Sequence, residues 1–279
     1  MVESENKPEC VIRARHGLIA IDFAELWRYR ELFWFLAWRD ILVRYKQTML
    51  GVLWAVLQPI LTMVVFTVIF GRIAKLPSNG APYALITLAA LLPWQLFANA
   101  MSQGSQSLIA SSNMITKVYF PRIIIPTSAT LSGLVDFAIS LVILVGVMLW
   151  YGVTPRWELL LLPLFSLSAF LAAFGVALWL SSLNVRYRDV KHVVPFLVRI
   201  GTYVSPVGFL SDVVPERWRL CYSLNPLVGV IDGFRWAILG PGFEPYWPGF
   251  WLGLAVCVVM LVSGALFFRS TEKTFADVI

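Results

Sequence analysis

The side chains that most often perform chemistry in proteins are scarce in this sequence and lie far apart. The three cysteines, Cys10, Cys221 and Cys257, form no CxxC pair, and the only histidines are His16 and His192. Zinc sites and disulfide frameworks need several such residues at short, regular spacing. We therefore expect no metal site, no disulfide framework and no proton relay built on histidine.

Sequence motifs of catalysis are missing as well. No GxxxxGK[ST], HExxH or GxSxG occurs, so the chain has no nucleotide-binding P-loop of its own. Within the long apolar segments only Asp136 and Arg199 are charged. These two residues could pair with each other, or either could face a water-filled path. Two charges are few for coupling transport to protons or sodium, so we expect energy to come from a partner.

The composition indicates a membrane protein. Of the 279 residues, 59% are hydrophobic and only 14% are charged, against about 25% charged residues in a typical soluble domain. The net charge of +6 does not indicate nucleic-acid binding, because the basic residues cluster at the ends of apolar segments, as expected next to anionic lipid. Residues 1–20 lack an apolar core, so we expect the first membrane segment to act as its own insertion signal.

Six apolar segments are long enough to cross a bilayer, which takes about 20 residues of helix. The predicted spans cover residues 50–70, 82–101, 123–151, 159–183, 193–211 and 247–268. The fifth of these is short and is interrupted by Pro195, Gly201 and Pro206.

Residues 220–240 are apolar enough to suggest a seventh span, but their polar content argues against it. They include Asp232, Arg235 and an Asn225-Pro226 break, which a continuous lipid-facing helix does not accommodate. Irregular backbone is tolerated at membrane depth where protein surrounds it. We therefore predict a re-entrant hairpin on the outer side, before the last span.

Basic residues predict which side of the membrane each loop faces. Lys and Arg concentrate before the first predicted span and after the second and fourth spans. Because cytoplasmic loops carry an excess of Lys and Arg, six spans place both residues 1–21 and the tail, residues 269–279, in the cytoplasm. Seven spans would place Arg269 and Lys273 outside, which fits the charge distribution less well.

Residues 22–46, before the first span, are predicted to form an amphipathic helix that lies in the membrane plane. Charged residues occupy much of one face, and apolar residues recur at helical spacing on the other. Tryptophan favours the depth of the lipid headgroups. The alternative is a helix packed on a soluble core, which this chain does not offer. The predicted apolar face consists of Phe23, Leu26, Trp27, Trp34, Ala37, Trp38, Ile41 and Tyr45.

Four segments in order resemble the ABC-2 type permeases that export bacterial polysaccharides such as O-antigen, capsule and teichoic acid. The resemblance covers nearly the whole chain from about residue 20 and is closest to the permease subunits of O-antigen exporters. Four motifs in this order specify the family far better than they specify the glycan. The segments are LWRYRELFWFLAWRDILVRYKQTMLGVLWAVLQPI (26–60), NMITKVYFPRIIIP (113–126), LNVRYRDVKHVVPFLVRIGTYVSPVGF (183–209) and SLNPLVGVIDGFRWAILG (223–240).

The resemblance implies an all-α integral membrane protein with a transmembrane domain over residues 50–268. It implies a homodimer in the bacterial inner membrane and two copies of a separate ATPase on the cytoplasmic side. ATP and Mg belong to that ATPase, so this chain is expected to bind no cofactor and to have no catalytic residues. The sequence agrees, since six spans can hardly enclose a wide pore alone.

Residues 111–122 match the coupling helix of the family, which contacts the ATPase. Ser111 or Ser112 can cap such a helix, and Pro121 ends it. One apolar face is predicted to carry Met114, Ile115, Val118 and Tyr119. The alternative is a helix lying flat on the membrane. The residues expected to couple to the ATPase are Ser112, Asn113, Met114, Ile115, Lys117, Val118, Tyr119 and Arg122.

Three further sets of residues are predicted to meet the substrate. The resemblance makes the first and fifth spans line a channel, where aromatic rings can stack on sugars; the alternative is an interfacial belt or ordinary packing. These aromatic residues are Trp54, Phe66, Phe70, Phe196, Tyr203 and Phe209. The residues predicted where the substrate or a lipid headgroup enters are Arg44, Lys46, Arg186 and Arg188. The outer gate is predicted at Asn225, Pro226, Asp232 and Arg235.

The leading hypothesis is ATP-driven export of a lipid-linked polysaccharide, O-antigen in particular. The same architecture could export teichoic acid, capsular polysaccharide or a small hydrophobic compound. The basic loop at residues 184–192 could contact the ATPase, anionic lipid or the pyrophosphate of the substrate, and the sequence leaves these three open. A membrane enzyme acting on lipid-linked sugars would need clustered carboxylates or histidines, and a secondary transporter would need more charges within its spans.

Overall fold

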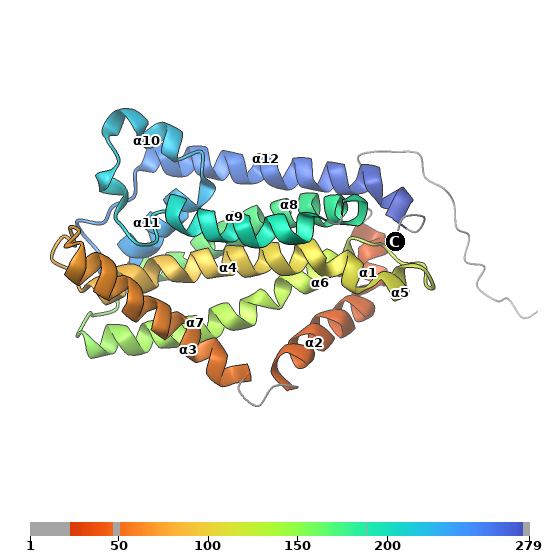
Figure 1. Ribbon diagram of the computed structural model, residues 1–279, viewed down its shortest axis with the longest axis horizontal. Helices are drawn as coiled ribbons and strands as arrows, with labels where there is room; N and C mark the ends of the chain where they lie inside the picture. Colours follow the sequence, from red (N-terminus) through yellow and green to blue (C-terminus); the bar gives the residue numbers. More distant parts are fainter. Residues whose placement is uncertain (1–22, 47–50, 188, 276–279) are drawn as a thin grey trace, which may run out of the picture.

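The computed structural model describes residues 23–46, 51–187 and 189–275. Within these ranges the chain forms helices joined by turns and loops, without strands, so the predicted all-α class is confirmed there. Figure 1 shows the long helices running side by side. The helices α1 (Phe23–Arg28) and α5 (Ser112–Ile115) lie at the same end of the bundle as the last turn of α12 (Trp247–Thr271).

Five helical stretches within the described residues are long and apolar enough to cross a membrane. They correspond to the first four predicted spans and to the last one, with shifted ends, and they make the chain a multi-pass membrane protein. In order they are α3 (Gly51–Phe66) with the π-helix η1 (Thr67–Ile73), α4 (Tyr83–Ala110), α6 (Ile124–Leu131) with α7 (Gly133–Trp150), η2 (Trp157–Leu161) with α8 (Leu162–Arg186), and α12 with η4 (Glu272–Thr274).

The predicted fifth span, residues 193–211, is not one long helix. The helix α9 (Val190–Val204) has 15 residues, or about 22 Å, against about 30 Å for the hydrocarbon core of a bilayer. It ends at Ser205, whose backbone is extended, because a residue before proline is pushed out of the helical region. The short 3-10 helix η3 (Ser211–Val213) follows after a turn.

The second span, α4, is the centre of the bundle. In its most apolar window 83% of the residues are buried, against 6% in the first span. It contacts α6, α7, α8, α9 and α11 (Pro226–Leu239). Figure 1 shows α12, α8 and α9 on one side of α4, with α3, α7 and α2 (Arg30–Lys46) on the other. The first span therefore lies at the edge of this subunit, and most of its surface is uncovered.

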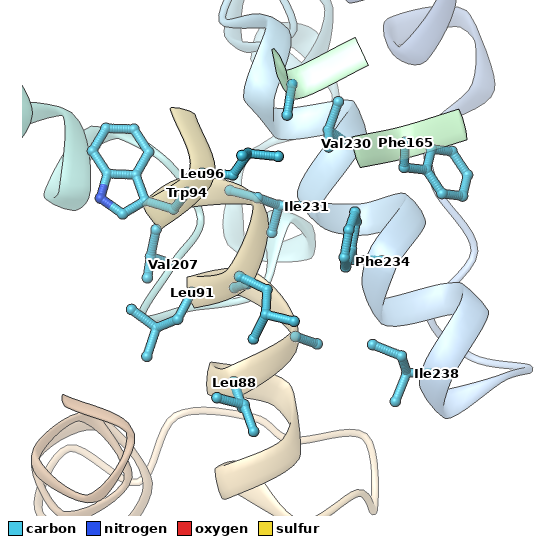
Figure 2. Close-up of a cluster of buried hydrophobic side chains, with 14 of the residues drawn as sticks. Leu88, Leu91, Trp94, Leu96, Phe165, Val207, Val230, Ile231, Phe234 and Ile238 are labelled. Atoms are coloured by element: carbon cyan, nitrogen blue, oxygen red, sulfur yellow. The ribbon is translucent and has the colours of Figure 1, made fainter. Parts of the chain in front are cut away.

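The largest hydrophobic cluster joins α4 to α11 and α8. Figure 2 shows Leu96 of α4 beside Ile231 of α11, while the Trp94 ring points the other way, toward α9. Phe165 of α8 lies beside Phe234, with 6.4 Å between the ring centroids. Burial of such side chains contributes about 1.5–3 kcal/mol each, so this cluster is a major support of the contact between α4, α8 and α11.

Residues 220–240 form two short helices rather than a span. The helix α10 (Glu216–Tyr222) ends before Ser223, and α11 begins after Asn225. The side chain of Asn225 accepts a hydrogen bond of 3.1 Å from the Leu227 amide, and Pro226 occupies the first helical position, as in many helix starts. Almost every residue of α11 is buried against α4, α8 and α12.

The helical segment before the first span differs from the predicted single apolar face. It consists of α1 and α2, with Tyr29 between them. Trp27, Trp34 and Trp38 share an exposed side, with 60–71% of their surface accessible. Ala37 is 3% exposed, and its neighbour Leu36 is buried too. Both lie on the side where α2 meets α6. The prediction that Ala37 and the tryptophans form one face is therefore wrong, because the helix is apolar on two sides.

Two glycines let α8 and α12 touch backbone to backbone. A Cβ atom at Gly264 would lie 2.3 Å from the carbonyl oxygen of Gly175. One turn away, the rings of Trp179 and Phe267 stack with centroids 4.1 Å apart. Close backbone approach through small residues is a common way for helices to associate in lipid.

We expect Gly264→Ala to lower the unfolding temperature of the purified protein in detergent. The added methyl group overlaps the α8 backbone, and overpacking of this kind costs about 1–3 kcal/mol. Gly146→Ala is the matched control, because Gly146 also lies within a span and a Cβ there meets nothing within 4 Å. Equal unfolding temperatures for the two variants would contradict the close contact.

Candidate functional site

The carboxylate of Asp136 joins three helices near the middle of the subunit. It lies in the first turn of α7, forms an ion pair with Arg44 and accepts a hydrogen bond from the Tyr45 hydroxyl. The side-chain amide of Asn99, on α4, donates to its other oxygen at 3.3 Å. The end of α2 is thereby fastened to α4 and α7.

To donate its hydrogen bond to Asp136, the Tyr45 phenol must keep its proton. Burial and the hydrogen bond to Asp136 raise the pKa of the Tyr45 phenol, so it remains a hydrogen-bond donor at physiological pH. Arg199, which the sequence offered as a partner for Asp136, lies exposed on α9. The pairing of Asp136 with Arg199 is therefore wrong, since the carboxylate is taken by Arg44 from α2.

A cavity of about 320 Å³ opens beside this ion pair, between α2, α3, α4 and α7. Because Arg44 and Asp136 neutralise each other, the remaining polar lining is mainly amide and hydroxyl. Amides can donate and accept hydrogen bonds at once, and Trp54 supplies an aromatic face that is 57% exposed. Such a lining fits a ligand rich in hydroxyl groups. The lining residues beyond the ion pair include Gln58, Gln95, Asn99 and Ser140.

Sequence reasoning missed these amide residues. Gln58, Gln95 and Asn99 all lie inside predicted apolar spans, and polar residues within spans usually face the protein interior or a water-filled cavity. That signal could have identified the cavity. Among the residues predicted to meet the substrate, Arg44 and Trp54 line it, and Asp136, which could have faced a water-filled path, lines it as well.

The other predicted entrance residues are not brought into this cavity. Lys46 is exposed at the end of α2, and Arg186 is exposed at the end of α8. The guanidinium of Arg186 lies over the Tyr187 ring, 5.6 Å from its centroid. Arg188 lies outside the described residues.

The predicted channel aromatics divide into two groups. Like Trp54, Phe196 and Tyr203 of α9 are exposed, with 60% and 67% of their surface accessible. Phe66, Phe70 and Phe209 are partly buried. Phe66 and Phe70 contact each other with centroids 5.3 Å apart, and Phe70 packs so closely on Gly208 that a Cβ there would be 2.7 Å away. Phe70 therefore supports the turn after α9.

The segment 111–122 is folded differently from the predicted helix. Its helical part is α5, only four residues long, and the side chain of Ser111 makes no capping hydrogen bond. Ile115 is buried, whereas Val118 and Tyr119 are exposed, at 58% and 64%. The four predicted apolar residues do not share a face, because the chain turns after Ile115 so that Phe120 can enter the core.

Two of the predicted gate residues, Asp232 and Arg235, form a buried polar network with the turn after α9. Arg235, 1% exposed, lies 3.7 Å from Asp232 on the same helix. Its guanidinium also donates to the carbonyl oxygens of Pro206 and Ile86, at 2.6 and 3.3 Å. The Asn225 amide donates to the Ser205 hydroxyl at 2.9 Å. The turn after α9 is thus held on α11 and α4.

Two tyrosines that sequence reasoning overlooked extend this network. The Tyr83 hydroxyl donates to the Gly208 carbonyl oxygen, and the Tyr222 hydroxyl donates to the Val204 carbonyl oxygen at 2.8 Å. The bond to Val204 satisfies a carbonyl group freed at the end of α9, where no following helical turn supplies a donor, and the bond to Gly208 satisfies one in the turn that follows.

The sequence matches one known protein family and is similar to several of its members. The sequence pattern of the ABC-2 type transporter family matches residues 31–239. The O-antigen export system permease protein RfbA of Myxococcus xanthus is 30% identical over 255 residues, which cover 91% of this chain and 97% of the relative. A protein of the same name from Klebsiella pneumoniae is 31% identical and covers 71% and 76%. The polysialic acid transport protein KpsM of Escherichia coli is 23% identical and covers 74% and 80%.

We expect Arg44 and Asp136 to be energetically coupled. In a double-mutant cycle with Arg44→Met and Asp136→Leu, measured by thermal unfolding in detergent, the coupling should be about 0.5–3 kcal/mol. The Arg39–Asp40 pair is the control, because it joins adjacent residues of α2 whose side chains are 42% and 24% exposed. Exposed pairs contribute about 0–1 kcal/mol. A coupling at Arg44–Asp136 no larger than the control would contradict the fastening of α2.

Proposed function

Because the chain belongs to the ABC-2 type transporter family, we propose that it is the permease subunit of an ATP-driven exporter of lipid-linked polysaccharide, in particular O-antigen. One observation carries the proposal, namely that 91% of this chain aligns with an O-antigen export permease over 97% of that protein. The permease makes and breaks no bonds. It moves the glycan from the cytoplasm to the periplasm across the inner membrane, while a separate ATPase subunit binds ATP and Mg and hydrolyses the ATP.

A homodimer with two ATPase subunits fits the uncovered surfaces. The first span is 6% buried in its apolar window, and α9 exposes Phe196, Ile200 and Tyr203. A second copy placed against these faces would enclose a channel between the subunits. In this arrangement α9 and the turn up to Leu210 together form the fifth of six crossings, and α10 with α11 form the re-entrant outer segment that carries the gate network of Asp232 and Arg235.

The exposed tryptophans of α1 and α2 support an interfacial position for these helices. Tryptophan prefers the depth of the lipid headgroups, and Trp27, Trp34 and Trp38 lie on the uncovered side of the segment. With this side in the headgroup region, the described N-terminal segment and the end of α12 face the cytoplasm, since they lie at one end of the bundle (Figure 1).

The cavity beside Arg44 is the proposed place where the substrate enters. Arg44 and Lys46 supply positive charge at the end of α2 for a pyrophosphate or an anionic headgroup, while Trp54 and the amides accept the first sugars. Arg186, exposed at the end of α8, supplies further positive charge. The exposed aromatic faces of Trp54 on α3 and of Phe196 and Tyr203 on α9 then guide the glycan by many weak stacking contacts.

The segment 111–122 is the proposed contact with the ATPase. Its exposed residues are Asn113, Thr116, Lys117, Val118 and Tyr119, and Ser112 and Met114 are partly exposed. Two large apolar side chains at the tip have no partner within the described part of the subunit, so a groove on the ATPase would cover them. Ile115 and Arg122 face inward and hold the segment in place.

A second cargo has a specific observation in its favour. The relative named as a polysialic acid transport protein aligns over 74% of this chain, so capsular polysaccharide is the alternative within the same mechanism. Teichoic acid or a small hydrophobic compound would also fit the architecture. Transport of isolated lipid-linked glycans into proteoliposomes distinguishes these cargoes directly.

We expect Tyr119→Asp to break the complex between this permease and the ATPase encoded beside its gene. A charge at the tip must be desolvated in an apolar groove, which costs several kcal/mol when it is unpaired. Co-purification of the two subunits measures the effect. Trp218→Asp is the control, since Trp218 is 55% exposed on α10 at the opposite end. An intact complex with Tyr119→Asp would refute this contact.

Removal of the exposed channel aromatics should slow transport without separating the subunits. For Phe196→Ala combined with Tyr203→Ala we expect a fall in glycan transport of about tenfold, which corresponds to about 1.4 kcal/mol. Phe267→Ala, which removes a ring stacked inside the bundle on Trp179, is the control for general damage. Unchanged transport in the double variant would show that α9 does not face the glycan.

A further inference from the structure

A small hydrophobic cluster, which we call the loop cluster, gathers segments that are far apart in the sequence. Its members come from α4, the segment 111–122, α6, α8 and the end of α12, and Tyr29 and Leu32 pack against it from the interfacial segment. It lies at the end of the bundle where α1, α5 and the end of α12 meet (Figure 1). The buried residues are Leu108, Ile115, Phe120, Ile125, Leu178, Val185, Phe268 and Phe275.

The last described residue, Phe275, is a full member of this cluster. It is 1% exposed, and its ring meets Phe268 edge to face with centroids 5.3 Å apart. Phe275 is therefore buried in the same cluster as Ile115 and Phe120 of the segment 111–122.

A polar bond reinforces the same contact. The guanidinium of Arg122, at the end of the segment 111–122, donates to the main-chain carbonyl oxygen of Glu272. The side chain of Glu272 pairs with Arg269 one turn earlier at 2.8 Å. Carbonyl groups at a helix C-terminus lack helical partners and carry partial negative charge, so a cation is favourable there. Arg122 thus fastens the segment to the end of α12.

The two sides of the segment 111–122 therefore have different partners. Val118 and Tyr119 point out of the subunit, and Ile115 and Phe120 point into the loop cluster. Force applied to the outer side can therefore reach the spans through the inner side, as well as along the backbone that joins the segment to α4 and α6. The tail residue Phe275 and the Glu272 carbonyl form part of the surface on which that inner side rests.

We propose that residues 272–275 are a brace that positions the segment 111–122, so that its displacement by the ATPase is transmitted to α12, α8 and the interfacial helices. This inference rests on the proposed function, because it assumes an ATPase at Val118 and Tyr119. The interfacial segment joins the same cluster through Tyr29 and Leu32, and its other end holds Arg44 and Tyr45 against Asp136. The brace therefore links ATP hydrolysis to the cavity where the substrate enters.

The test is the ratio of glycan transported to ATP hydrolysed by the complete permease–ATPase complex in proteoliposomes. We expect Phe275→Ala to keep the ATPase bound and to lower this ratio by about tenfold, within the usual range of coupling between sites. Phe275→Leu, which keeps an apolar side chain in the cluster, should restore most of the ratio. Phe267→Ala is the matched control, because it removes a ring from the same end of α12 but outside the loop cluster.

An unchanged ratio with Phe275→Ala would overturn the brace. Should that variant fail to assemble, Arg122→Gln decides, since it removes only the bond to the Glu272 carbonyl, and a ratio equal to that of the unmodified protein would also overturn the proposal. Failure of the unmodified chain to bind the ATPase or to move glycan would refute the proposed function instead, so the two failures are distinguishable.

Discussion

A buried carbonyl group that has no water beside it must find a hydrogen-bond donor within the protein. This constraint acts where α9 stops short and the chain turns back toward the core. Arg235 donates to the carbonyl oxygen of Pro206, and the Tyr83 hydroxyl donates to that of Gly208. With these bonds in place, a helix of 15 residues can end inside the bundle. The positions of α10 and α11, and of the aromatic face of α9, follow from that ending.

The sequence predicts the spans well where the signal is local. An apolar run of about 20 residues is sufficient to locate a membrane helix, and five of the six predicted spans are present as long helices. The family, expected from four motifs, is confirmed by the match over residues 31–239. The fifth span was predicted too long because hydropathy does not show that Arg235, from a distant helix, will satisfy the carbonyl groups of a turn.

The candidate site was less predictable, since it depends on contacts between distant segments. Asp136 was visible as a charge within a span, but its partner Arg44 comes from a helix outside the spans, and no local pattern connects them. The segment 111–122 has the periodicity of an amphipathic helix. Its structure is instead governed by Phe120, which the loop cluster takes in at the expense of helical continuation. For the Asp136–Arg44 pair and for the segment 111–122 alike, contacts between distant segments outweigh the local sequence pattern.

The deep burial of α4 has a consequence for how the protein is made. Among the five long helices α4 has the lowest mean hydropathy and the greatest burial, whereas the helix before it is almost bare. A segment of modest apolarity inserts into a bilayer less readily by itself than a strongly apolar one. During synthesis α3 leaves the ribosome before α4 and can settle in lipid alone. By contrast, α4 must wait for α7, α8 and α11 to surround it. The centre of the finished bundle is therefore the last part to become stable. A chain truncated after α4 would lack these neighbours and would be degraded by quality-control proteases.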